Sequence, residues 1–294
     1  MHAVESGSNL FGVTAPDSSL PNNAAGITDS RYQLKSVGRA LRLMEILAEH
    51  ADHGLSVTEA ASLLGASKSA TFSMLQTLVA FNFATDSERG PRYRLGPAVL
   101  RLADSHTRSN PLVALVRPHL RSLTEETGWT SRLASHQDGY PVFIDRVDGP
   151  GSIRFFTSIG IREQPHHSAA GKAILAELDE SSVRLIARET GLPRRTRHTI
   201  TDVTALLADL ALIRTRGFAV DDGEDETGIL CLGAAFSGRD GRPLGAVSIT
   251  GLKAEVPDWK VQELGSIVRA HADQMTLAVG GTARSTGPNI QETE

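Results

Sequence analysis

Cysteine is almost absent from this chain of 294 residues, since Cys231 is its one thiol. A single thiol excludes an internal disulfide framework and suits a reducing cytoplasm, where we expect the protein to act. No run of eighteen apolar residues occurs, so no membrane span is expected. No basic stretch followed by an apolar core opens the chain, so no secretory signal is expected. A Gly-rich phosphate-binding loop with its Lys-Ser/Thr is also missing, which argues against a P-loop enzyme.

The net charge is small, at −4, but it is unevenly distributed. Residues 31–101 hold nine Lys or Arg against six Asp or Glu, whereas residues 1–30 hold three acids and no Lys or Arg. The rest of the chain is therefore acidic. A local excess of cations in an acidic chain indicates a segment that binds a polyanion. Two copies of this segment in a dimer would carry enough charge to bind DNA.

Composition and periodicity divide the chain into five segments. Residues 1–30 are rich in Ser, Asn, Gly, Ala and Pro without periodicity, and they are expected to be disordered. The expected segments that follow are a DNA-binding domain over 31–96, a linker helix over 97–110, an effector-binding domain over 111–280 and a flexible tail over 281–294.

Two short amphipathic helices and a basic hairpin are predicted between residues 56 and 96. Ser56 and Glu59 form a capping-box pattern, and Gly65 is placed to end the first helix. Ser67 is placed to cap the second helix. A two-stranded hairpin follows over 83–95. This order is typical of a winged helix-turn-helix, which binds double-stranded DNA.

A preceding helix is expected to complete a three-helix core. It starts after Ser36, and its predicted apolar face consists of Val37, Ala40, Leu41, Met44, Leu47 and Ala48.

The predicted DNA contacts fall into two groups. Small polar side chains with a leading cation can enter a major groove and bond base edges. This group on the second helix is Lys68, Ser69, Phe72, Ser73 and Gln76. Cations of the first helix and of the wing can hold phosphates. This second group is Arg39, Arg42, Arg89, Arg92 and Arg94.

The second half of the chain is predicted to be an α+β domain with an antiparallel sheet. Its expected helices cover 112–127, 169–178, 181–190, 203–216 and 258–279. Its expected strands cover 129–135, 141–147, 153–158, 229–236 and 243–250. Phe155, on the third of these strands, is placed to wall a ligand pocket.

Several blocks in order resemble the IclR (isocitrate lyase regulator type) family. They include SVGRALRLMEIL, GLSVTEAASLLGASKSAT, RYRLGPAVLRLA, HHSAAGKAILA and GAVSITG, and the resemblance covers roughly residues 34–279. It implies a winged helix-turn-helix, a linker helix and a GAF-like effector-binding domain. It also implies a dimer or dimer of dimers on a palindromic operator. The expected function is repression of a catabolic operon, modulated by a small organic acid or related carbonyl compound, aromatic ones included. Activation by the same architecture stays open.

The resemblance also implies the positions of the effector site. They are Ala169, Ala170, Asp221, Ile229, Cys231, Ser248 and Thr250. The residues themselves agree with this assignment. Ala169 and Ala170 open a helix whose free amides can bind a carboxylate or carbonyl, and Ser248 and Thr250 lie two apart on a strand, so both hydroxyls point to one side.

One departure from the family concerns the recognition helix. Phe72-Ser73 stands where the family usually has a His-Arg pair, so the operator sequence is expected to differ from those of other family members.

The residues also suggest two other classes of function, an enzyme and a metal-binding protein. Cys231 with His167 could form a nucleophile and base of a small-molecule hydrolase, and the adjacent His166 and His167 with the acidic 221–226 loop could suggest a metal site. An apolar strand disfavours a thiolate, and adjacent histidines on an extended segment point opposite ways. No catalytic residue, metal or cofactor is therefore expected. An interaction protein without a ligand is the remaining alternative.

Overall fold

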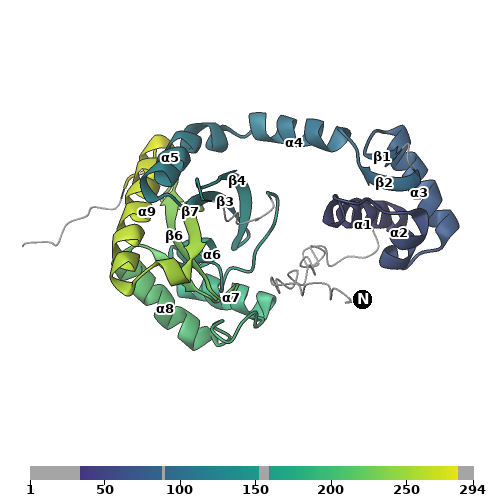
Figure 1. Ribbon diagram of the computed structural model, residues 1–294. Coiled ribbons are helices and arrows are strands. Elements are labelled where there is room, and N and C mark those ends of the chain that lie inside the picture. The colour runs from purple at the N-terminus through teal and green to yellow at the C-terminus, as the bar shows by residue number, and fades with distance from the viewer. Residues whose placement is uncertain (1–33, 88–89, 152–158, 284–294) are drawn as a thin grey trace, which may run out of the picture. The chain divides into compact units, whose positions relative to one another are not determined.

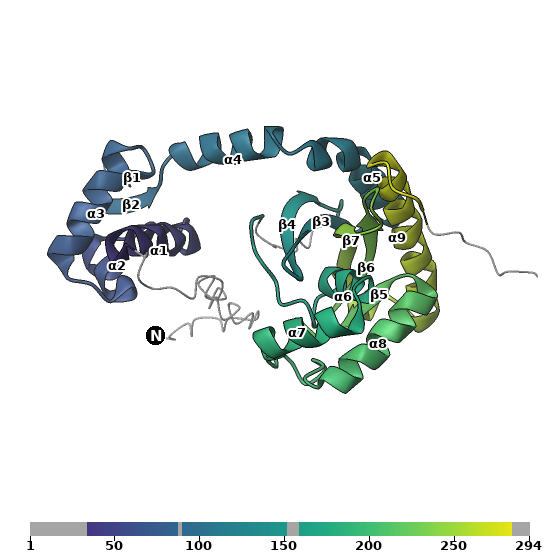
Figure 2. The ribbon, with the colours of Figure 1, turned by 180° about the vertical axis from the view of Figure 1, so that it is seen from behind.

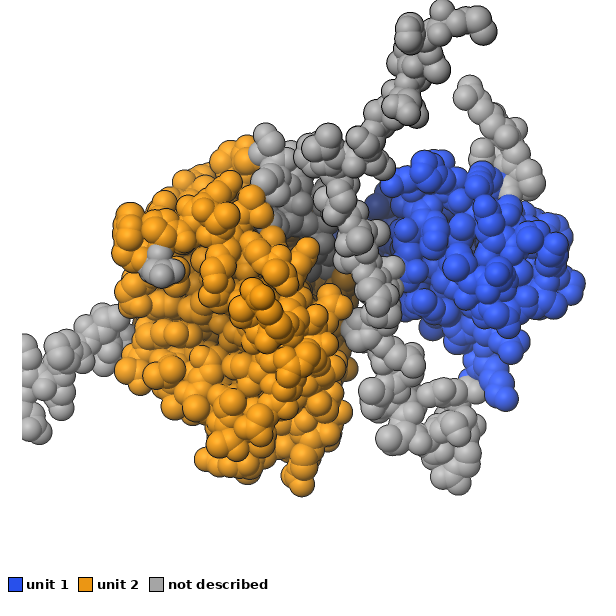
Figure 3. Space-filling model, turned by 60° about the horizontal axis from the view of Figure 1, so that its bottom comes forward, with its two compact units in different colours: residues 1–105 blue, residues 106–294 orange. Residues whose placement is uncertain are grey.

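A computed structural model describes residues 34–87, 90–151 and 159–283. Predictions for residues 1–30, for Arg89, for the 153–158 strand with Phe155, and for residues 284–294 lie outside this range. The chain forms two compact units, residues 1–105 and 106–294 (Figure 3).

The first unit contains three helices and a hairpin (Figure 1). Its elements are α1 (Lys35–Glu49), α2 (Val57–Leu64), α3 (Lys68–Ala80), β1 (Ala84–Ser87) and β2 (Gly90–Leu95). The predicted caps are confirmed: Ser56 and Glu59 form both bonds of a capping box, and Gly65 ends α2 at φ +64°. Ser67 caps α3 by accepting a hydrogen bond from the Ala70 amide. The antiparallel β1–β2 hairpin completes the winged helix-turn-helix.

The predicted apolar face of α1 is wrong in part. Val37, Leu41 and Ala48 are exposed, and the helix buries Leu43, Ile46 and Leu47 in the core of the unit. α1 has two overlapping apolar stripes, and packing against α2 and β2 buries the stripe that contains Leu43, Ile46 and Leu47. Periodicity alone could not distinguish the two stripes.

A further helix, α4 (Ala98–Arg108), occupies most of the predicted linker segment. The boundary between the two units falls within it, after residue 105. Leu100 and Leu102 on this helix are exposed.

The second unit is an α+β domain built on one sheet. Its helices are α5 (Pro111–Thr127), α6 (Ala169–Ala176), α7 (Glu180–Thr190), α8 (Val203–Arg216) and α9 (Asp258–Ala278), with a short 3-10 helix η3 (Lys253–Glu255). Its strands are β3 (Thr130–Gln137), β4 (Tyr140–Val147), β5 (Ala219–Asp222), β6 (Ile229–Ser237) and β7 (Pro243–Leu252). The strand order is β4-β3-β7-β6-β5, and every neighbouring pair is antiparallel. The sequence did not predict β5, an edge strand of four residues.

Helices cover both faces of this sheet (Figures 1 and 2). α5 and α9 pack on one face, around Leu120, Leu232 and Val268. α6, α7 and α8 pack on the other face, around Ile174, Leu206 and Ala246. Because β6 and β7 are buried on both sides, their sequences are almost continuously apolar.

Gly233 on β6 lets α6 start directly against the sheet. A Cβ added at this position would lie 2.8 Å from the carbonyl carbon and oxygen of Ala169 and 3.0 Å from the Ala170 nitrogen. All three are backbone atoms that cannot rotate away. The absence of a side chain at residue 233 therefore fixes the distance between the first turn of α6 and the sheet.

We predict that Gly233→Ala displaces α6 and lowers the free energy of unfolding of the second unit by about 1–3 kcal/mol, as overpacking of a tight contact does. Gly38→Ala is the control, since a Cβ there meets no atom within 4 Å. The control should stabilise α1 by up to about 1 kcal/mol, as an Ala does in a helix interior. Urea unfolding followed by circular dichroism measures both effects. Equal stability of Gly233→Ala and the parent chain would contradict the packing argument.

Candidate functional site

The recognition helix presents the predicted groove-facing side chains to solvent. Lys68, Ser69, Phe72, Ser73 and Gln76 are all exposed on α3, with Phe72 at 48%. Three of them, Ser69, Ser73 and Gln76, already make local hydrogen bonds, and the Ser69 hydroxyl lies 3.3 Å from that of Ser67. The Ser73 hydroxyl donates to the Ser69 carbonyl oxygen at 3.1 Å, and the Gln76 amide donates to the Tyr93 hydroxyl at 3.0 Å. Tyr93 on β2 therefore fixes the orientation of Gln76.

Three of the predicted phosphate-binding arginines have partners within the first unit. Arg92 on β2 makes two hydrogen bonds of 3.2 Å to Glu59, the capping-box residue of α2. Arg42 pairs with Glu45 at 2.9 Å and with Glu49 at 3.3 Å. Arg94 donates to the Asp52 carbonyl oxygen at 2.9 Å. A DNA phosphate would therefore compete with the carboxylates that already bind Arg42 and Arg92.

In the second unit, four of the predicted effector residues lie together on the sheet face that α6 covers. The register pairs Asp221 with Cys231, Cys231 with Thr250, and Gly233 with Ser248. Directly paired residues in an antiparallel sheet point to the same face. These side chains, together with Thr130 and Arg132 of β3, form a continuous polar patch, and each is at most 6% exposed. We call Thr130, Arg132, Asp221, Cys231, Ser248 and Thr250 the polar patch.

The other predicted effector positions fall as follows. Ala169 and Ala170 open α6, and the Gly233 contact holds them against the sheet beside the patch. Ile229 is half-buried at the start of β6, where it pairs with Leu252. Phe155 lies outside the described residues.

Contacts within the polar patch are incomplete. The Cys231 sulfur lies 3.3 Å from the Thr250 hydroxyl and 3.6 Å from Nη2 of Arg132. The Ser248 hydroxyl is fully buried and has no hydrogen-bond partner within the described part of the chain. Burial raises the pKa of the Cys231 thiol, so it stays protonated and is a poor nucleophile.

Asp221 anchors the loop that follows β5. Its Oδ1 accepts hydrogen bonds from the backbone amides of Glu224 at 2.7 Å and Asp225 at 3.3 Å. Burial raises the pKa of Asp221 to about 7, and this effect exceeds the opposing effect of the Glu224 amide. Asp221 therefore combines a structural role with an ionisation that takes place near neutral pH.

A buried ammonium joins this loop to two helices. Lys172 of α6 is 1% exposed, and its Nζ lies 2.5 Å from Oε1 of Glu224 and 2.9 Å from Oδ2 of Asp209 on α8. Breaking a buried ion pair leaves an uncompensated charge, so these three groups hold the loop firmly against α6 and α8.

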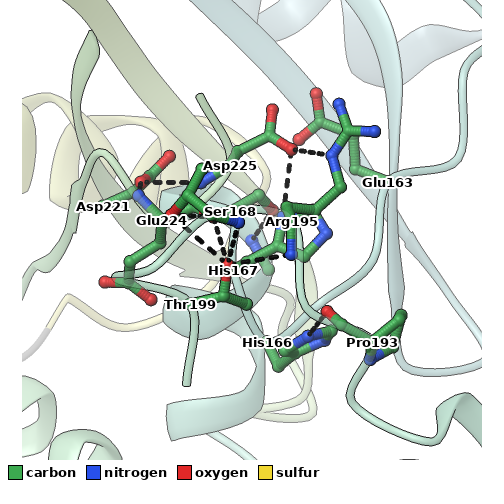
Figure 4. A network of polar contacts seen from close by, with 12 residues as sticks. Glu163, His166, His167, Ser168, Pro193, Arg195, Thr199, Asp221, Glu224 and Asp225 are labelled. Atoms are coloured by element: carbon green, nitrogen blue, oxygen red, sulfur yellow. Dashed lines mark hydrogen bonds and ion pairs between the residues drawn. The ribbon is translucent and has the colours of Figure 1, made fainter. Parts of the chain in front are cut away.

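A second polar network lies at the start of α6 (Figure 4). His167 Nδ1 lies 3.2 Å from Asp225, and Arg195 lies 3.3 Å from the same carboxylate oxygen. His166 contacts the Pro193 carbonyl oxygen at 3.0 Å. Burial lowers the pKa of His167 to about 4, so the imidazole is neutral at physiological pH. The described residues include no group of three or more His, Cys, Asp or Glu that could hold a metal ion.

The sequence missed several members of these networks. Arg132, Glu163, Lys172 and Arg195 were not predicted to be functional, although all four lie near the predicted effector residues. A lysine or arginine in a sequence usually indicates an exposed position, and no local signal marked Lys172 or Arg132 as buried.

A DNA-reading unit followed by a unit with a buried polar patch defines a ligand-responsive DNA-binding regulator, and comparison with known proteins agrees. Residues 36–87 match the IclR helix-turn-helix domain, and residues 105–277 match the bacterial transcriptional regulator IclR C-terminal domain. The chain belongs to the IclR family of transcriptional regulators.

Known relatives match over most of their length. The chain is 34% identical over 251 residues to the transcriptional repressor IclR of Escherichia coli K12, covering 85% of this chain and 91% of that protein. It is 33% identical over 252 residues to the acetate operon repressor of Salmonella typhimurium, covering 85% and 92%. The crystal structure of Thermotoga maritima IclR matches with a TM-score of 0.71 at 26% identity, covering 84% of this chain and 100% of that one. Among the described helices, none is long and apolar enough to cross a bilayer.

The pKa of Asp221 generates a prediction for stability. The folded-state pKa of about 7 exceeds the ordinary value of 3.8, so the folded chain binds the extra proton between these pH values. Ionisation of Asp221 therefore lowers the free energy of unfolding as pH rises from about 4 to about 7. His167 acts with the opposite sign, because its pKa is lowered from 6.5 to about 4. We predict that Asp221→Asn gains stability relative to the parent as pH rises through this window, by up to about 1.4 kcal/mol per pH unit.

Asp179→Asn is the control for this titration. Hydrogen bonds from Ser181 and Ser182 lower the pKa of Asp179 to about 2, so its contribution is present above pH 4 and is lost as pH falls toward 2. Denaturant unfolding at a series of pH values separates the two variants. A constant difference between Asp221→Asn and the parent from pH 4 to 7 would show that Asp221 ionises normally.

Proposed function

We propose that this protein is a repressor that releases or weakens its hold on an operator when a small organic acid or related carbonyl compound binds. One observation supports this proposal most directly. A single IclR-family chain contains both an exposed recognition helix and a buried polar patch whose hydrogen bonds are incomplete. The names of the Escherichia coli and Salmonella relatives support repression over activation. Because its DNA target lies there, we assign its action to the cytoplasm.

In this proposal α3 enters the major groove. Lys68, at the start of the helix, binds phosphate, and Phe72 contacts a thymine methyl. Gln76 keeps its amide oxygen for a base, since its nitrogen is held by Tyr93. Ser69 and Ser73 supply weak hydroxyl contacts. Five arginines bind phosphates of the DNA backbone: Arg39, Arg42, Arg89, Arg92 and Arg94.

We further propose that the regulator acts as a dimer or dimer of dimers on a palindromic operator, which doubles the cationic surface that meets DNA. In this proposal residues 31–96 form the DNA-binding domain, residues 97–110 form the linker helix and residues 111–280 form the effector-binding domain. The effector acts only through unequal affinity for the DNA-competent and DNA-incompetent arrangements.

The effector would bind between the polar patch and the first turn of α6. The Ala169 and Ala170 amides face a carboxylate or carbonyl at a helix N-terminus, and Ser248 supplies a free hydroxyl. Asp221, Cys231 and Thr250 form the opposite wall, with Ile229 at its edge and Phe155 as a proposed further wall. The proposal includes no catalysis, because the Cys231 thiol is protonated and contacts Thr250 and Arg132.

We predict that the full chain binds DNA from its own upstream region with a strong salt dependence. Arg92→Ala should weaken DNA binding and reduce the magnitude of the slope of log K against log salt by about 1, if the Arg92 guanidinium binds one phosphate. Glu59→Gln should strengthen DNA binding, because it frees Arg92 from its carboxylate partner while glutamine keeps the capping box. Arg242→Ala, an exposed cation of the second unit, is the control and should bind as the parent does. DNA binding that does not depend on salt, or no DNA binding at all, would contradict the proposal that the protein is a regulator.

We also predict that an Asp221→Ala, Ser248→Ala double variant keeps its DNA affinity and loses its response to the effector. The first readout is the thermal shift produced by acetate, lactate, succinate or benzoate, and the second is release from labelled operator DNA by the same acid. Arg242→Ala again serves as the control. A double variant that responds as the parent does would place the effector elsewhere, and turnover of any of these acids would favour an enzyme.

A further inference from the structure

Arg132 brings a buried positive charge to the polar patch. It lies on β3, pairs in register with Ser248 and is 6% exposed. Its guanidinium stacks 4.5 Å above the Phe143 ring and reaches across β7 to within 3.6 Å of the Cys231 sulfur. Gly233 is two residues from Cys231 on β6, so the guanidinium lies close to the place where α6 begins.

Glu163 is the carboxylate that faces this charge. Its Oε1 lies 3.6 Å from Nη1 of Arg132, well beyond the roughly 2.8 Å of a charge-assisted hydrogen bond. The backbone holds Glu163 in place, because its amide donates to the Pro141 carbonyl oxygen at 3.1 Å and Arg162 forms a bridge with Val142. The pair therefore has charge complementarity without close contact.

Charged and titratable groups from several elements surround Glu163. Glu163 faces Arg132 of β3, Asp225 of the loop after β5 and Arg195 of the loop after α7. The Cys231 thiol and Asp221 lie behind Arg132. His167, beside Asp225, is neutral (Figure 4). Burial raises the pKa of Glu163 to about 7, with Arg132 opposing and Asp225 adding to the increase.

We infer that Glu163 is an internal counter-ion that holds, in the ligand-free protein, the position at Arg132 that a carboxylate of the effector takes on binding. This inference rests on the proposed effector site and names its ligand class. The ligand is a small carboxylate that bridges Arg132, the Ser248 hydroxyl and the first amides of α6. Arg132 is the residue that selects an acid over a neutral compound.

Two observations separate this exchange from a permanent structural ion pair. The Ser248 hydroxyl, next to Arg132 in the register, is buried without a partner in the described part of the chain, which is costly unless a ligand supplies one. The Arg132–Glu163 contact is also longer than a settled buried pair requires. A ligand carboxylate between Arg132 and Ser248 would give the Ser248 hydroxyl a partner and could place an oxygen closer to the guanidinium than Glu163 lies.

The exchange is balanced by one proton. Before binding, the ionised Glu163 neutralises Arg132. After binding, the ligand carboxylate neutralises Arg132, and Glu163, having lost its cation in a buried site, takes up a proton from solvent. Binding of a monocarboxylate above pH 7 therefore consumes close to one proton, and acid affinity falls as pH rises through and above 7.

The experiment compares acids with their neutral amides in the full chain, using acetate with acetamide, lactate with lactamide, and benzoate with benzamide. Titration calorimetry in buffers of different ionisation enthalpy gives affinity and proton uptake together. We expect the acids to bind and the amides not to bind. Arg132→Met should weaken acid binding by about thirtyfold or more, since removal of one partner of a buried charge pair has that effect.

Glu163→Ala supplies a second test that does not depend on the natural effector. Removal of the internal counter-ion should let acetate raise the melting temperature more than it does in the parent, and acetate binding should consume fewer protons than in the parent, with Asp221 as the remaining group that titrates near pH 7. Equimolar sodium chloride and acetamide control for ionic strength and size. The double variant Arg132→Met, Glu163→Ala should lose the acetate effect, and Arg242→Met should behave as the parent.

Equal binding of acids and amides, unchanged proton uptake in Glu163→Ala, or no stabilisation by any acid would each overturn the inference. These results would leave the proposed function standing if the chain still bound its upstream DNA with the predicted salt dependence. Loss of that DNA binding in the parent chain would instead overturn the proposed function itself.

Discussion

The structure of the second unit depends on the burial of the sheet face that α6, α7 and α8 cover, although half of that face is polar. One half of that face is apolar and packs against α6, α7 and α8 around Ala246 and Ile174. The other half is the polar patch, and Gly233 lets the first turn of α6 lie directly beside it. A buried polar group without a partner costs about 1–3 kcal/mol, so the patch must be satisfied by the chain or by a ligand. The chain satisfies it incompletely.

Two loops and the segment before α6 carry the charges that surround this patch. Asp221 and Lys172 fix the loop after β5, and Thr199 holds the loop after α7 to it through the Glu224 carbonyl oxygen. Asp225 then contacts both His167 and Arg195. Loss of the Arg132–Glu163 pair would change the field at Asp225, because Glu163 faces that carboxylate. A carboxylate bound at Arg132 would therefore change the electrostatic potential at Asp225, which pairs with His167 and Arg195.

Local signals made most of the fold predictable. The Ser56–Glu59 capping box and Gly65 fixed the helix-turn-helix, since each acts within a few residues. The face of α1 and the edge strand β5 could not be predicted, because tertiary packing selects the first and the second is only four residues long. At the candidate site, spacing grouped Ser248 with Thr250. Arg132 and Glu163 escaped notice because pairing through β3 and β4 brings them together from 31 positions apart.

The central claim is that the polar patch is a binding site for a carboxylate. A crystal structure of the full chain with a bound carboxylate, chosen as the acid of highest measured affinity, tests it most directly. We expect one carboxylate oxygen within hydrogen-bond distance of the Arg132 guanidinium and another near the Ser248 hydroxyl and the Ala170 amide, with Glu163 moved away from Arg132. An acid bound elsewhere, with the Arg132–Glu163 pair intact, would contradict the claim.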